Sequence, residues 1–99
     1  MKLLTEELRK QLPPLYSQEN EEDPMVICKF FDPCGSFSWF IIEFDGDDLL
    51  FCKVFSSLCP EGELGYSSLS EIQSVRGALG LGIERDLYFK PKKLSDCKG

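Results

Sequence analysis

Three apolar runs follow one another in the middle of this chain with only short turns between them. The runs occupy residues 25–31, 37–44 and 49–55. Asp32-Pro33-Cys34-Gly35 separates the first two, and Asp45-Gly46 begins the connection between the second and third. Asp-Gly favours the type I′ turn of a β-hairpin. Because the runs are too short for buried helices, the sequence predicts a three-stranded antiparallel meander.

Side-chain alternation within the second run predicts which residues share a face of that sheet, because successive residues of a strand point to opposite sides. One face is expected to carry Trp39, Ile41 and Glu43, and the other Phe40, Ile42 and Phe44.

A helix is predicted at each side of the meander. Leu4, Leu8 and Leu12 recur at a spacing of four and would share one helical face, with Thr5 as the cap. Pro13-Pro14 ends that helix, and Leu15 and Tyr16 are expected to pack down beyond it.

The second helix is expected over residues 69–76. Ser68 and Glu71 have the spacing of a capping box, and Gly77 follows as the stop signal. Its inward residues would be Leu69, Ile72 and Val75.

The remaining segments contribute little regular structure in this interpretation. Residues 56–62 are expected to be a loop, residues 64–66 a short extended piece, and residues 86–90 a last strand. The basic tail, about residues 91–99, is expected to be frayed. The sequence therefore predicts one α+β domain over residues 1–99, with two short helices packed against a small antiparallel sheet.

Charge and composition exclude several function classes. The net charge of −6 disfavours direct nucleic-acid binding, because an acidic surface repels phosphates. No apolar run approaches the roughly 20 residues of a membrane span, and the N-terminus lacks a signal-peptide pattern. These features predict a cytoplasmic protein whose thiols stay reduced.

Metal, cofactor and nucleophile signatures are weak. The five cysteines (Cys28, Cys34, Cys52, Cys59 and Cys97) lack the close pairs of a zinc site, and the chain has no histidine. Asp45, Asp47 and Asp48 do not follow a calcium-loop spacing. The glycines at 77, 80 and 82 follow a predicted helix instead of a strand, unlike a phosphate-binding loop. We expect no cofactor and no metal.

A polar set in the last third has the composition of an interaction site. Arg and Tyr are favoured at interfaces because they combine contact area with directional hydrogen bonds. An internal network of arginines and carboxylates would explain the same residues structurally. With two strand residues added, the candidate interaction or pocket residues are Trp39, Glu43, Tyr66, Arg76, Arg85, Asp86 and Tyr88, with Glu84 beside them.

Stretches along nearly the whole length of the chain carry a family resemblance: Met1 to Tyr16, Lys29-Phe30-Phe31, Trp39, Glu43-Phe44-Asp45-Gly46, Glu63-Leu64-Gly65-Tyr66, Ser68 to Ile72, Val75-Arg76-Gly77, Leu79-Gly80-Leu81 and Ile83 to Phe89. In these stretches the chain resembles the DUF2958 family. The family is a bacterial domain of unknown function, often on mobile elements, and the resemblance implies such a setting but no catalytic residues.

The leading hypothesis is a non-enzymatic module that binds a protein partner. Its sharper form is an acidic inhibitor that competes with DNA for a basic partner. One alternative is a small enzyme or ligand-binding domain whose pocket brings together Glu43, Tyr66, Arg76, Arg85 and Asp86. Another is a cysteine-based metal-binding module.

Overall fold

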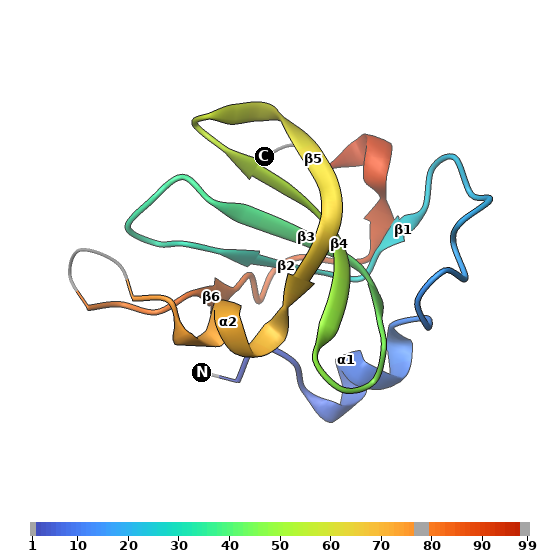
Figure 1. Ribbon diagram of the computed structural model, residues 1–99, viewed down its shortest axis with the longest axis horizontal. Coiled ribbons are helices and arrows are strands. Elements are labelled where there is room, and N and C mark those ends of the chain that lie inside the picture. Colours follow the sequence, from blue (N-terminus) through green and yellow to red (C-terminus); the bar gives the residue numbers. More distant parts are fainter. Residues whose placement is uncertain (1, 77–79, 98–99) are drawn as a thin grey trace.

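The computed structural model describes residues 2–76 and 80–97, and most of this part of the chain is organised around one antiparallel sheet (Figure 1). The sheet has the strand order β5-β4-β3-β2-β6. Its strands are β2 (Cys28–Phe31), β3 (Ser38–Phe44), β4 (Leu49–Ser56), β5 (Cys59–Ser68) and β6 (Glu84–Arg85). A two-stranded sheet pairs β1 (Met25–Val26) with β7 (Lys92–Lys93). The helices are α1 (Glu6–Gln11), α2 (Leu69–Ser74) and the 3₁₀ helix η1 (Leu94–Asp96).

The predicted meander is present as β2, β3 and β4, and the α+β class is confirmed in its general form. The first predicted strand is divided, because β1 pairs with β7 while β2 pairs with β3. The strand count differs from the prediction of a three-stranded meander with short extra strands, because the main sheet has five strands and a second sheet lies beside it.

The largest correction concerns residues 56–66, where a loop over 56–62 and a short extended piece over 64–66 were expected. Only Ser57 and Leu58 form the turn, and β5 then runs for ten residues along β4. The Ser56 hydroxyl accepts the Cys59 amide at 3.2 Å and tightens the turn. An edge strand tolerates Pro60, because its outward-facing positions need no ladder hydrogen bond.

A bulge in β3 changes which of its side chains share a face. The register shifts between Ile41 and Glu43, so that Glu43 lies opposite Phe51 and Phe44 lies opposite Leu50. The extra residue interrupts the alternation. Phe44 therefore packs on the face of Trp39, which the sequence prediction had wrong, and Glu43 moves to the other face.

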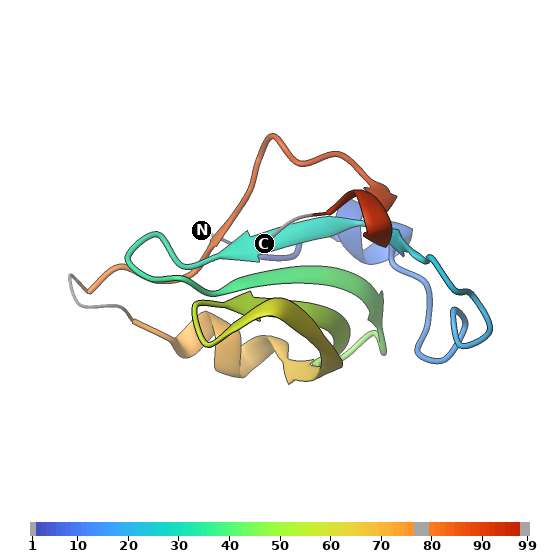
Figure 2. The same cartoon turned by 90° about the horizontal axis from the view of Figure 1, so that it is seen from above.

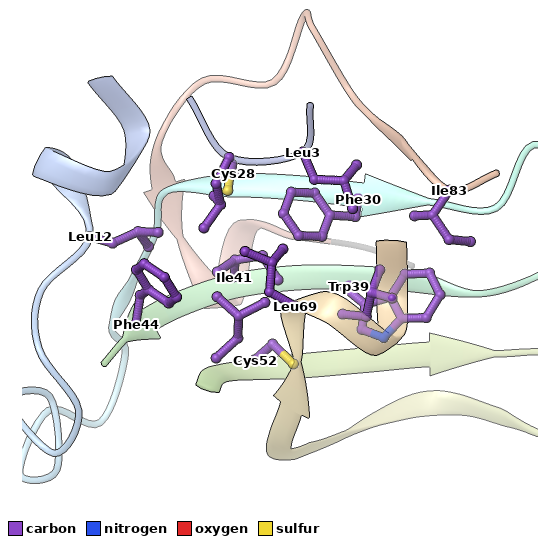
Figure 3. Packing of buried hydrophobic residues seen from close by; sticks show 13 residues of the cluster. Leu3, Leu12, Cys28, Phe30, Trp39, Ile41, Phe44, Cys52, Leu69 and Ile83 are labelled. Atoms are coloured by element: carbon purple, nitrogen blue, oxygen red, sulfur yellow. The ribbon is translucent and has the colours of Figure 1, made fainter. Parts of the chain in front are cut away.

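The two faces are covered by different ends of the chain. Leu3, Leu4 and Leu12 of the N-terminal segment, together with α2, cover the face that carries Trp39 and Ile41 (Figure 3). The opposite face carries Phe40, Ile42 and Phe55, with Phe89, Leu94 and Cys97 packed over it. Figure 2 shows α2 and η1 on opposite sides of the central strands. None of the helices in the described ranges is long and apolar enough to cross a membrane.

The helix boundaries follow the local signals closely at their starts. The Thr5 hydroxyl accepts the Leu8 amide at 3.2 Å, and α1 ends at Gln11 before the two prolines. The Ser68 hydroxyl accepts the Glu71 amide at 3.3 Å. However, α2 ends at Ser74, short of the predicted residue 76, and leaves Val75 exposed. Gly77, the predicted stop, lies outside the described residues.

The hairpin at Asp45 is confirmed, but its turn is not of type I′. That type needs a positive φ at two central residues, and only Gly46 in this turn has one, at 90°. The Asp45 Oδ1 atom accepts the amides of Asp47, Asp48 and Leu49 at 2.8 to 3.0 Å, which closes the wider turn.

The C-terminal segment is better ordered than its composition suggested. Residues 86–90 do not form the predicted strand, because the chain turns there with the Phe89 amide donating to Asp86 O at 3.3 Å. The described part of the tail is not frayed. The Asp23 carboxylate accepts the Ser95 amide and hydroxyl at 2.8 and 2.6 Å, and Cys97 is buried.

Candidate functional site

A row of three side chains crosses the edge half of the sheet on one face. Glu43 of β3 lies opposite Phe51 of β4, and Phe51 lies opposite Tyr66 of β5. Directly opposed residues point to the same side, so the row places a carboxylate beside two aromatic rings. The Phe51 and Tyr66 ring centroids are 5.2 Å apart.

The Glu43 side chain is buried, with 3% of its surface exposed, and its carboxylate holds the segment after the two prolines. Oε1 accepts the Tyr16 amide at 2.9 Å, and Oε2 accepts the Gln18 amide at 2.7 Å. Hydrogen bonds to a buried carboxylate are stronger than those between neutral groups. They hold Tyr16 with a φ of 70°, in the left-handed region that is uncommon for a residue with a side chain.

Tyr16 thereby lies beside the row, with its ring centroid 6.3 Å from that of Tyr66. The row and the segment from Tyr16 to Pro24 enclose a hollow of about 310 Å³, which we call the acidic depression. Its lining consists of Tyr16, Gln18, Glu19, Glu21, Glu22, Pro24, Glu43, Phe51, Leu64, Tyr66 and Leu94.

The charged side chains that line the acidic depression are all negative. Four of its lining side chains are carboxylates, and within the described chain its lining includes no Lys or Arg. The pKa of the Tyr66 hydroxyl lies above its usual value, first because of desolvation and then because of its hydrogen bond with Tyr16. The negative charges of Glu43 and Glu19 raise this pKa further. The hollow therefore favours positive over negative charge.

Of the seven predicted site residues, Glu43 and Tyr66 line the acidic depression. Trp39 belongs to the core with 9% of its surface exposed, and its ring stacks on Phe37 at 5.7 Å. Tyr88 is 92% exposed in the turn after β6, and its amide donates to the Asp86 carboxylate at 2.9 Å.

The two arginines of the predicted site donate hydrogen bonds to main-chain carbonyls. Arg76 Nη1 donates to the carbonyls of Gln73 and Val75, both at 2.8 Å. Arg85 Nη1 donates to the carbonyls of Lys2 and Leu3 at 2.6 and 2.9 Å, which ties β6 to the N-terminal segment. These bonds tie Arg76 to the end of α2 and Arg85 to the N-terminal segment.

Within residues 2–76 and 80–97, the five residues of the ligand-binding alternative line three different hollows. Glu43 and Tyr66 line the acidic depression, Arg76 lines a hollow with Ile83, and Arg85 and Asp86 line a third hollow beside Thr5. None of these three hollows is lined by all five residues.

Three of the five cysteines, Cys28, Cys52 and Cys97, are buried. Burial raises the pKa of the Cys28 thiol to about 12 and also raises the pKa of Cys52 and of Cys97. A thiol of this kind is a weak nucleophile and a weak metal ligand at neutral pH. Across residues 2–76 and 80–97, no group of three or more His, Cys, Asp or Glu side chains is placed to hold a metal ion.

Sequence reasoning missed the contribution of Tyr16, Phe51 and Glu19 to the site. A sequence signal existed: Tyr16 lies two residues after Pro14 and shortly before the most acidic segment of the chain, residues 19–23. Acidic runs are usually solvated loops, so the acidic segment alone did not indicate a site.

Comparison with known proteins gives one match. The family model described as "Protein of unknown function (DUF2958)" matches residues 3–96. No curated protein and no solved structure matches the chain.

Proposed function

This chain belongs to the DUF2958 family, and from the geometry of its acidic depression we propose that it is a non-enzymatic module that binds a basic protein partner. The observation that carries the proposal is that carboxylates and exposed tyrosines line the same hollow. Tyr16 and Tyr66 are 61% and 49% exposed, although they sit among four glutamates. Exposed aromatic rings among charges of one sign are typical of a surface that a partner covers.

The charge of the whole chain supports the same conclusion. A net charge of −6 steers positively charged molecules toward the protein and repels acidic ones. We propose a cytoplasmic partner that itself binds DNA, in a bacterial or mobile-element system, with this protein as an acidic competitor. Binding of that kind weakens as salt rises, because exposed charges are screened.

The experiment is affinity capture from a lysate of the natural host, followed by purification of the captured protein and measurement of its affinity. The test variant changes Glu19, Glu21 and Glu22 to Gln. The control variant changes Glu6, Glu7 and Glu71 to Gln and alters the net charge equally, away from the acidic depression.

The proposal expects a basic partner that the control variant retains and the test variant loses. Its affinity should fall steeply with added salt, and duplex DNA should displace the protein from it. A partner that binds both variants equally, or whose affinity ignores salt, would refute binding through the acidic depression. Failure of DNA to compete would refute the inhibitory role.

A further inference from the structure

The aromatic rings of the acidic depression indicate which chemical group of a basic partner it would bind. Three rings line the hollow, and neighbouring planes are tilted by 50° between Phe51 and Tyr66 and by 56° between Tyr16 and Tyr66. They therefore do not stack face to face. The face of an aromatic ring carries negative electrostatic potential and attracts ammonium and guanidinium groups.

The chain uses this interaction at several other places. Arg9 lies 5.2 Å from the centroid of Phe44, and Lys29, Lys53 and Lys92 lie 5.2 to 5.4 Å from the centroids of Phe40, Phe55 and Phe89. Within the described ranges, no Lys or Arg occupies such a position on Tyr16, Phe51 or Tyr66. The rings that line the acidic depression thus carry no cation from the described part of the chain.

The carboxylates add charge to the aromatic surface. Glu19, Glu21 and Glu22 are exposed along the hollow, while Glu43 is buried below and holds Tyr16 in place. A cation on the rings would therefore meet carboxylates beside it and compensate part of their mutual repulsion.

The volume limits the size of the group. About 310 Å³ is at the low end of the roughly 300–1,000 Å³ of small-molecule pockets. A hollow of this size suits one long side chain better than a nucleotide or a large cofactor.

We propose that the acidic depression binds the side chain of one Lys or Arg of the partner, with its charged head against Tyr16 and Tyr66 and its carboxylate partners among Glu19, Glu21 and Glu22. This inference rests on the proposed function, because it assumes a basic protein partner. It adds that one cationic side chain is the anchor of the complex.

The test uses small probes and needs no knowledge of the partner. The ¹⁵N-labelled protein is titrated with N-acetyl-arginine amide and N-acetyl-lysine amide while amide chemical shifts are recorded by NMR. N-acetyl-citrulline amide is the matched control, because it has nearly the shape of the arginine probe without its charge. Saturable shifts are expected at Tyr16, Gln18, Phe51 and Tyr66 with a cationic probe, and none with citrulline.

Three variants separate the aromatic contribution from the contribution of charge. Tyr66→Leu keeps an apolar side chain but removes the ring, and should weaken probe binding by about three- to tenfold. Tyr88→Leu removes an even more exposed tyrosine elsewhere and should leave binding unchanged. Glu19→Gln, which keeps the side-chain shape, should weaken binding without affecting the fold.

Three results would overturn the inference: no saturable shift with either cation, equal shifts with citrulline, or equal binding to the Tyr66→Leu variant. The proposed function is judged separately, with the captured partner. A partner that needs Glu19, Glu21 and Glu22 but binds Tyr66→Leu normally would leave the proposed function standing and remove only the cationic anchor.

Discussion

Replacement of Glu43 by Gln tests whether its buried carboxylate holds the segment that completes the acidic depression. The carboxylate accepts two backbone amides, at 2.9 and 2.7 Å. A glutamine has one acceptor oxygen, so its NH₂ group would face one of these two donors. A hydrogen bond to a charged group contributes about 1.5–3 kcal/mol, and a buried donor left unpaired costs about 1–3 kcal/mol.

Part of this loss is offset, because burying a neutral amide costs less than burying a carboxylate. We therefore expect the free energy of unfolding to fall by about 2 kcal/mol, which for a domain of this size lowers Tm by roughly 10 °C. Urea unfolding followed by Trp39 fluorescence measures the first quantity. Amide hydrogen exchange at Tyr16 and Gln18 should accelerate in the variant.

Glu63→Gln is the matched control, since Glu63 is exposed on β5, and its free energy of unfolding should change by less than about 0.5 kcal/mol. If the Glu43 and Glu63 variants were equally stable and the exchange of Tyr16 and Gln18 were unchanged, the carboxylate would not be what holds this segment. The structural basis of the acidic depression would then be wrong.

Three further predictions concern other parts of the fold. Gly62→Ala should cost about 2 kcal/mol in urea unfolding, because φ is +80° and the added Cβ would lie 2.7 Å from Phe55; Gly65→Ala, with open space around it, should be nearly neutral. A disulfide reagent at neutral pH should modify exposed Cys34 rapidly and Cys28 only on unfolding, which mass spectrometry can follow. The pKa of Asp48 lies below its usual value of 3.8, first because the Ser68 hydroxyl donates a hydrogen bond to the carboxylate. The ionised carboxylate therefore contributes its full stabilisation of the fold above pH 3.8, and this stabilisation is lost as the pH falls through the lowered pKa. Asp48→Asn should therefore reduce the loss of stability between about pH 5 and pH 2 in urea unfolding; an unchanged loss would contradict that assignment.

Features fixed by neighbours in the sequence could be predicted. Thr5 and the two prolines bound α1, and Asp45-Gly46 connects β3 to β4, because these signals act within a few residues. Features fixed by distant partners could not. Pro60 and Gly62 are turn formers by local preference, and β5 accommodates them because it lies at the sheet edge. The lysines of β7 look like a solvated tail, but β7 joins β1 through its backbone, which any side chain permits.

The error in the face assignment of β3 and the failure to find the site have the same cause. A regular strand would put Glu43 beside Ile41 on the face of α2, where a carboxylate would be buried among apolar side chains. The bulge avoids this: it sends Phe44 to that face and turns Glu43 toward Phe51 and the Tyr16 amide. Neither side of the bulge has a glycine or proline to mark it, so strict alternation is the natural reading of this segment. A charged residue within an otherwise apolar strand is nevertheless a usable signal, because a buried carboxylate needs hydrogen-bond donors from another part of the chain. Here those donors belong to the turn that places Tyr16 beside Tyr66.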